Sequence, residues 1–331
     1  MSTVEEANFY IVCPPPPVTT TTTTTVSYVF AGYPTAPGHV DKISPSTMSL
    51  VKTFTAPSGH NYVYALITLS GYVFVGYYAS PGRVDKISPS TMSLVKTFTA
   101  PSGHYNLRAL TSLSGYVFAG YSAASSRVDK ISPSTMSLIK TFTSTHFHLL
   151  SLTSLSGYVF AGYSTSPGHV DKISPSTMSL VKTFTAPSGH YYVLSLASLS
   201  GYVFAGYYTA YVDKINPSTM SLVKTFTAPY GHNEVFALTS LSGYVFAGYY
   251  TSFGHVDKIS PSTMTLVKTF TAPYGHNYVL SLTSLSGYVF AGYSTTPGYV
   301  DKIDSITMSL VKTFTPPSGH NSVHALTTLA T

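Results

Sequence analysis

A repeat of about 44 residues runs through almost the whole chain and constrains its fold more than any other feature. The motif Tyr-Val-Phe-(Ala/Val)-Gly-Tyr begins seven times, at Tyr28, Tyr72, Tyr116, Tyr158, Tyr202, Tyr244 and Tyr288. Successive copies start 44, 44, 42, 44, 42 and 44 residues apart. A fixed period in this range indicates equivalent structural units that stack or close into a ring.

Each repeat contains short β-rich segments separated by residues that favour turns. The first copy predicts strands over Tyr28–Tyr33, Val40–Ser44, Ser49–Thr55 and Tyr62–Leu69. Pro and Gly mark the loops between them, and Gly32 allows a close approach inside the first strand. The two shorter copies, from Tyr116 and Tyr202, each lose two residues from predicted loops and none from predicted strands. Four short strands per unit indicate a β-propeller blade, and helix is nowhere supported.

The ends of the pattern predict how the ring closes. It starts on Tyr28–Tyr33 and finishes on Ser322–Ala330, a copy of the segment that elsewhere precedes Tyr-Val-Phe. The last strand would therefore complete the first blade, leaving no sheet incomplete. We predict an all-β fold: a seven-bladed β-propeller over residues 28–331, with four antiparallel strands per blade, preceded by an extended N-terminal arm over residues 1–27.

The segment order also resembles a known family. Val-Asp-Lys-Ile, then Pro-Ser-Thr-Met-Ser-Leu-Val-Lys-Thr-Phe-Thr, is similar to the YVTN-type repeats of surface-layer and lactonase-like propellers. The likeness covers residues 28–331 and implies a seven-bladed disc, often on a cell surface, but no single activity. The repeats do not look like WD40 repeats, because the chain contains no tryptophan.

The N-terminal arm differs in composition from the repeats. It holds an apolar patch, four prolines and seven threonines between two valines: Phe9, Tyr10, Ile11, Val12; Pro14–Pro17; and Val18, Thr19, Thr20, Thr21, Thr22, Thr23, Thr24, Thr25, Val26. Prolines favour an extended rod, and β-branched threonines favour a strand over a helix. We expect the arm to dock on a surface; the alternative is a disordered stalk, O-glycosylated at the threonines.

Charge and cysteine content exclude several classes of protein. The net charge of +6 comes almost wholly from one Asp and two Lys in every repeat, so it is spread evenly and does not form the basic face of a nucleic-acid binder. The single cysteine, Cys13, leaves no intramolecular disulfide and no multi-cysteine metal site. No apolar run is long enough to span a membrane, and no secretory signal is visible at the N-terminus. We nevertheless expect an extracellular or cell-surface location.

Histidines recur in the predicted loops. If the strand that precedes Tyr-Val-Phe is counted as the first of a blade, the loops after the second and fourth strands of the meander lie on one face. This would gather a ring of histidines there: His60, His104, His146, His190, His232, His276 and His320. His39, His169 and His255 would join from the other loop. A ring of imidazoles could bind a metal or an anion, but we expect no cysteine or carboxylate to join them and therefore assign no metal site. The alternative is a loop histidine copied by duplication.

An Asp-Lys dipeptide also occurs in every repeat, at Asp41-Lys42 in the first. It predicts either equivalent ligand sites or, as the simpler interpretation, cross-strand or inter-blade ion pairs.

Catalysis finds little support, since almost every ionisable residue is repeated and no known catalytic motif is present. We therefore expect a non-enzymatic protein without a cofactor. The leading hypothesis is a structural, self-assembling extracellular subunit of a filament or surface layer, whose arm docks on a neighbouring copy. The alternative is a multivalent lectin-like propeller that uses loop tyrosines and histidines to bind glycans. A lactonase-like enzyme is the weakest of the three hypotheses.

Overall fold

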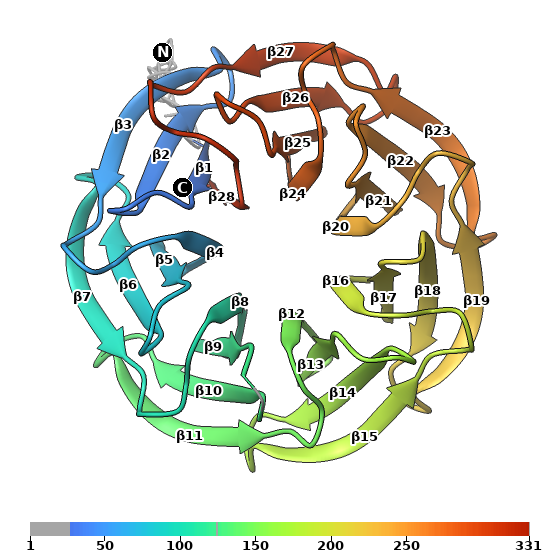
Figure 1. Ribbon diagram of the computed structural model, residues 1–331, viewed down its shortest axis with the longest axis horizontal. Coiled ribbons are helices and arrows are strands. Elements are labelled where there is room, and N and C mark those ends of the chain that lie inside the picture. The colour runs from blue at the N-terminus through green and yellow to red at the C-terminus, as the bar shows by residue number, and fades with distance from the viewer. Residues whose placement is uncertain (1–26, 124, 331) are drawn as a thin grey trace, which may run out of the picture.

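The computed structural model describes residues 27–123 and 125–330, and these form a closed ring of seven four-stranded antiparallel sheets (Figure 1). Each blade runs from an inner strand at the channel, through a second and a third strand, to an outer strand at the rim. The inner strands are β28 (Ala325–Ala330), β4 (Val63–Leu69), β8 (Leu107–Leu113), β12 (Leu149–Leu155), β16 (Val193–Leu199), β20 (Val235–Leu241) and β24 (Val279–Leu285). The second strands are β1 (Ser27–Tyr33), β5 (Tyr72–Tyr77), β9 (Tyr116–Tyr121), β13 (Tyr158–Tyr163), β17 (Tyr202–Tyr207), β21 (Tyr244–Tyr249) and β25 (Tyr288–Tyr293).

The remaining strands complete the blades outwards. The third strands are β2 (His39–Ser44), β6 (Arg83–Ser88), β10 (Arg127–Ser132), β14 (His169–Ser174), β18 (Tyr211–Asn216), β22 (His255–Ser260) and β26 (Val300–Asp304). The outer strands are β3 (Ser49–Thr55), β7 (Ser93–Thr99), β11 (Ser137–Thr143), β15 (Ser179–Thr185), β19 (Ser221–Thr227), β23 (Thr265–Thr271) and β27 (Leu310–Phe314). The predicted strands of the first repeat are confirmed to within a residue, and the first described strand begins at Ser27.

The predicted closure is confirmed. β28 pairs antiparallel with β1, with Ala31 opposite Leu326, so the end of the chain supplies the inner strand of the first blade. The first and last described strands therefore lie side by side in one sheet (Figure 1). Every blade has four strands as a result, and no sheet in the described ring lacks its inner strand.

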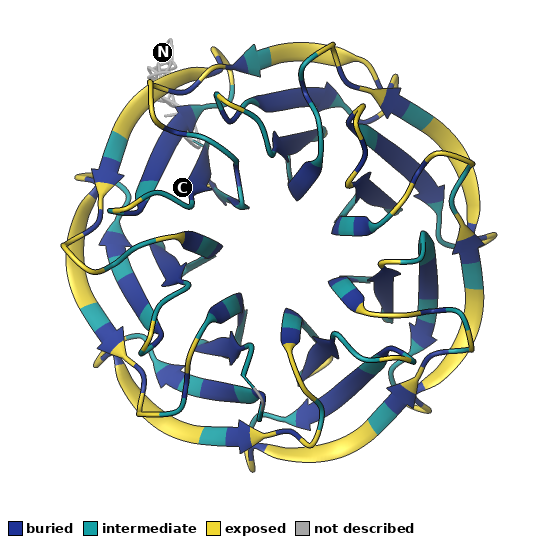
Figure 2. Ribbon diagram, in the orientation of Figure 1, coloured by how far each residue is buried: buried dark blue, intermediate teal, exposed yellow. Residues whose placement is uncertain are grey.

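The hydrophobic core lies between blades rather than inside one sheet. Between the first two blades, Phe30 and Phe54 of the first pack against Val75, Tyr77 and Met92 of the second. The second and third strands are accordingly buried, whereas the outer strands are exposed along most of their length (Figure 2). At Gly32 a side-chain Cβ would lie 2.5 Å from Val63 Cγ1 of the next blade, which explains the need for glycine there.

The outer strands depart from the regular alternation expected of a β-strand. Over Ser49–Thr55 that alternation would place Leu50 and Phe54 on the same face, yet Phe54 is buried and Leu50 is 40% exposed. The pairing of β2 with β3 skips a residue: Lys42 faces Lys52, but Ile43 faces Leu50. This β-bulge leaves Val51 as the extra residue and breaks the alternation, and the same shift recurs in the other blades.

Candidate functional site

A buried polar cluster is repeated in every blade. In the second blade His60 Nδ1 donates to Asp85 Oδ2 over 2.8 Å, and Thr97 Oγ1 donates to Asp85 Oδ1 over 2.6 Å. The histidine lies in the loop arriving from the preceding blade, while the aspartate and threonine lie on the third and outer strands. The same pairs join His104–Asp129, His146–Asp171, His190–Asp213, His232–Asp257, His276–Asp301 and His320–Asp41. Each cluster therefore fastens a long loop to the blade that follows it.

A tyrosine from the second strand lies against each cluster. Its ring packs on the histidine, with centroids 4.8 Å apart for Tyr33 and His320. Tyr249 Oη donates to Asp257 Oδ2 over 2.9 Å, whereas the other six hydroxyls have no hydrogen-bond partner among the described residues. Burial, and then the negative charge of Asp41, raises the pKa of Tyr33 well above its usual value. The hydroxyl therefore stays protonated.

The seven histidines predicted as a ligand ring do lie on one face, as expected, since their loops bond to the loops after the second strands (Gly38 N to His60 O, 2.9 Å). His39 also joins them, with its ring 4.6 Å from that of His320. The expectation that no carboxylate joins them is wrong: each ring histidine has an aspartate partner at 2.8–3.3 Å and a side chain at most 19% exposed. Within residues 27–123 and 125–330, no three metal-binding side chains gather. A role in ligand binding stays a prediction.

Among the described residues the aspartates of the Asp-Lys dipeptides pair with histidines and not with lysines, so the interpretation as cross-strand or inter-blade Asp–Lys ion pairs is wrong. The two residues are neighbours in a strand, so their side chains point to opposite faces. Asp41 accepts from His320 and Thr53, whereas Lys42 Nζ donates to the carbonyl of Pro89 in the next blade over 2.8 Å and lies 3.6 Å from the centroid of the Tyr28 ring. Equivalent lysine bonds run round the ring and close at Lys302 and Pro45. Each lysine therefore joins its blade to the next one; we call this hydrogen bond from a lysine to a turn carbonyl of the next blade a lysine latch.

The sequence loses its sevenfold equivalence at the mouth of the central channel. The second residue of the inner-strand segment differs in chemistry between blades: Tyr64, Arg108, Leu150, Leu194, Phe236, Leu280 and His324. All seven line one cavity of about 350 Å³, together with Tyr250 and Ser294 from the loops after the second strands. The mouth is thus built from positions where the repeats differ, on the same face as the histidine loops.

One half of the mouth is cationic. The guanidinium carbon of Arg108 lies 4.7 Å from the ring centroids of both Tyr64 and Tyr78. The His324 ring meets Tyr64 edge-on, with centroids 4.5 Å apart. Burial, and then the positive charge of Arg108, lowers the pKa of His324 to about 4. His324 is therefore neutral at pH 7, and Arg108 is the only charged side chain among those lining the cavity.

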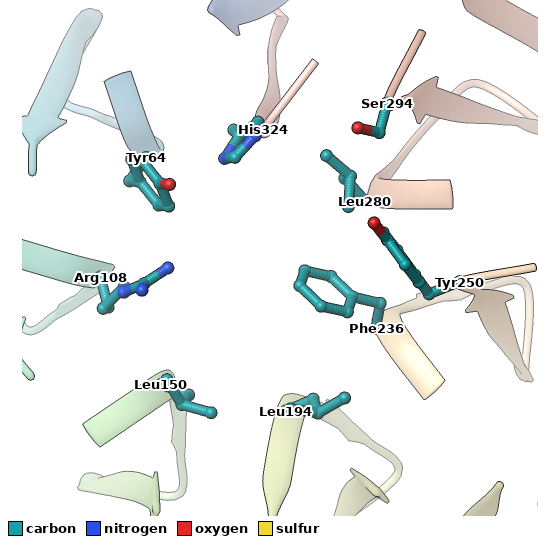
Figure 3. Close-up of a pocket in the computed structure, with 9 residues that line it drawn as sticks. All are labelled: Tyr64, Arg108, Leu150, Leu194, Phe236, Tyr250, Leu280, Ser294 and His324. Atoms are coloured by element: carbon teal, nitrogen blue, oxygen red, sulfur yellow. The ribbon is translucent and has the colours of Figure 1, made fainter. Parts of the chain in front are cut away.

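The other half of the mouth is aromatic and aliphatic. Figure 3 shows Phe236 across the cavity from Arg108, with Tyr250 and Leu280 beside it. The rings of Phe236 and Tyr250 lie 5.6 Å apart, and Tyr250 stacks on Tyr278 at 4.4 Å. A small number of polar groups facing a mostly apolar wall is typical of sites for small molecules.

Sequence reasoning missed this site although its signal was present. Arg108 is one of the few ionisable residues that do not recur, and in sequence such residues are scattered over different blades. Aligning the seven repeats shows the signal directly, because the column from Tyr64 to His324 holds five residue types, whereas the neighbouring Leu66 column is leucine in all copies. The predicted arm residues from Phe9 to Val26, including the threonines, and Cys13 lie outside the described residues. Residues 27–123 and 125–330 include no helix capable of crossing a membrane.

Comparison with known proteins supports the fold but assigns neither a family nor a function. No protein-family model matches the chain, and no curated protein matches its sequence. Among solved structures it is similar to the computationally designed Ika8 protein, with a TM-score of 0.64 and 16% identity over 89% of this chain and 86% of that one. It is also similar to the WD40 β-propeller domain of Doa1, with a TM-score of 0.65 and 13% identity over 81% and 86% of the two chains. The chain is therefore a seven-bladed β-propeller that resembles designed and WD40 propellers in fold, without a family assignment.

Proposed function

We propose that this protein is a binding propeller that holds a small ligand at the mouth of its central channel. The observation that carries the proposal is the gathering of unlike side chains at one structurally equivalent position, in a chain that otherwise repeats itself. A position needed only for packing would accept leucine in every blade, as at Leu150, Leu194 and Leu280. Distinct residues around one cavity are what recognition of an asymmetric ligand requires.

A mouth-blocking variant tests this proposal. Leu194→Trp would fill part of the cavity, and Leu94→Trp, at an exposed rim position, is the matched control. We expect a ligand-observed NMR screen of small fragments to find binders for the unmodified protein and for Leu94→Trp that are lost in Leu194→Trp. Circular dichroism checks that each variant is folded. Binders unaffected by Leu194→Trp, or a screen without binders, would refute the proposal.

Glycans stay a candidate class of ligand for the same face. Exposed loop tyrosines, including Tyr191, Tyr192 and Tyr208, offer aromatic surfaces on which sugars can stack. Such a lectin would have several equivalent sites in one chain. Glycan-array binding that survives Leu194→Trp would favour it over the single site at the channel mouth.

Self-assembly through the N-terminal arm is the second candidate function, and the rim favours it. Each outer strand is the edge of its sheet and exposes two neighbouring aliphatic side chains, such as Leu50 and Val51. Free edges accept added strands. The preceding residues, 1–26, include a β-branched run, Val18–Val26, suited to such pairing. In this proposal the arm of one copy docks on the rim of the next, in an extracellular filament or layer.

Electron microscopy of the full chain beside a variant lacking residues 1–26 tests the assembly. We expect filaments or sheets from the full chain and separate discs from the truncated one. Assembly that persists after the deletion would contradict a role for the arm. Kinship with the YVTN-type surface-layer repeats, which rests on Val-Asp-Lys-Ile and the strand that follows it, is part of this second proposal.

A further inference from the structure

The three arginines of the chain differ in what their guanidinium groups contact. Arg83 and Arg127 begin third strands, and each donates to a carbonyl of the loop that arrives from the preceding blade, Gly59 O and Gly103 O. Arg108 has no hydrogen-bond or ion-pair partner among the described residues, and its Nε atom is buried. A buried N–H without an acceptor is costly, because the group has lost its water without a replacement.

The surroundings of Arg108 orient it without neutralising it. Tyr64 and Tyr78 offer ring faces at 4.7 Å, which stabilise a cation but accept no hydrogen bond in the plane of the guanidinium. Among residues 27–123 and 125–330, no aspartate or glutamate lines the cavity, and His324 is neutral at pH 7. The N–H groups of the two terminal guanidinium nitrogens are therefore free for an anion, and a carboxylate can accept two parallel bonds from them.

The wall opposite Arg108 indicates the chemistry of the rest of the ligand. Phe236, Tyr250 and Leu280 present aromatic and aliphatic surface facing Arg108 (Figure 3), and the polar groups beside them are the hydroxyls of Tyr250 and Ser294. A sugar would leave most of its hydroxyls without partners on such a wall. A flat apolar ring would stack there instead. The volume of about 350 Å³ is near the lower end for small-molecule sites, which indicates a compact ligand.

We infer that the channel mouth binds a small aromatic monocarboxylate, its carboxylate on Arg108 and its ring against Phe236 and Tyr250. This inference rests on the proposed function and names the ligand class of that site. One unpaired cation at neutral pH matches one negative charge. Phosphate groups are not favoured, because the lining holds a single arginine and no lysine.

Titration calorimetry with benzoate and its neutral isostere benzamide tests the charge. We expect benzoate to bind about tenfold or more tightly than benzamide, as a charge-assisted hydrogen bond of about 1.5–3 kcal/mol would give. Arg108→Leu installs the residue that three other blades carry at this position and should abolish the preference. Arg127→Gln is the control: it removes the same charge from the same face but outside the cavity, and it should leave the preference for benzoate over benzamide unchanged.

Phe236→Leu tests the wall: we expect it to weaken benzoate and benzamide by the same factor. Inorganic phosphate should not displace benzoate. Equal affinity for benzoate and benzamide, equal losses in Arg108→Leu and Arg127→Gln, or displacement by phosphate would each overturn the inference. If the fragment screen finds other ligands that Leu194→Trp abolishes, the proposed function survives such a result. If that screen finds none, both fail.

Discussion

The two faces of the disc have diverged to different extents. On one face lie the turns between inner and second strands and between third and outer strands, and these read Ser-Gly and Pro-Ser-Thr-Met in nearly every blade. The other face carries the long loops, both two-residue deletions and the channel mouth with its unlike residues. The turn face and the loop face have the same fold beneath them, so the fold alone does not explain why one stayed uniform.

The contacts explain the difference. On the turn face, each turn methionine is buried and each lysine latch ends on a turn carbonyl, so a change there disturbs two blades. On the loop face, the histidine–aspartate cluster and backbone hydrogen bonds between neighbouring loops hold the loop backbone, while side chains at the channel mouth line the cavity. Positions released from packing are free to take up recognition. The following experiments test this separation, from the largest effect to the smallest.

Removing a cluster histidine should have the largest effect, because it leaves a buried carboxylate short of a partner. We expect His104→Ala to lower the free energy of unfolding by about 3–5 kcal/mol. His146→Ala is the internal comparison: its contact with Asp171 is 3.3 Å, and Ser144 Oγ also donates to that carboxylate. His146→Ala should therefore lower the free energy of unfolding by less than His104→Ala does. Urea unfolding followed by circular dichroism measures both, and equal losses would show that Ser144 does not compensate.

Acid should destabilise the loop face through His324. Its pKa is lowered to about 4 in the folded protein, so between pH 6.5 and 4 the unfolded chain binds a proton that the folded one does not. Stability should fall across that window by up to about 3 kcal/mol. His324→Leu should remove this part of the loss. His39, His169 and His255, whose pKa values burial also lowers, would leave a residual slope. Thermal unfolding of the unmodified protein and of His324→Leu, measured from pH 7 to pH 4, gives the comparison. If stability fell equally with pH in both proteins, the role of His324 would be contradicted.

Breaking one lysine latch should have a moderate effect on the turn face. Lys86 Nζ donates to Pro133 O over 3.0 Å and lies 3.8 Å from the centroid of the Tyr72 ring. Lys86→Met keeps the aliphatic packing and removes both interactions, so we expect a loss of about 1–2 kcal/mol. Lys96→Met, on the exposed part of the outer strand, is the control and should be near neutral. If Lys96→Met lowered the free energy of unfolding as much, the effect would come from the change in net charge and not from the lost contacts of Lys86.

The smallest effect on stability is expected for a substitution at Ile306, where the turn face departs from the repeat. Ile306 stands where the other turns have serine, and it is 80% exposed. Ile306→Ser should change stability by less than about 0.5 kcal/mol. A larger loss in urea unfolding would show that Ile306 has a partner, which would contradict the uniformity of this face.

The sequence by itself determined the blade number, the strand segments and the closure of the first blade by Ser322–Ala330, because each follows from a period and a phase that local patterns carry. It did not determine the partners of Asp41 and Lys42, since neighbours in a strand point to opposite faces and their contacts come from residues far along the chain. The bulge at Val51 was likewise decided by pairing with β2. Only the closed ring brings Tyr64, Arg108, Phe236 and His324, residues from four blades, to one cavity, because closure turns equal positions in separate repeats into neighbours around one axis.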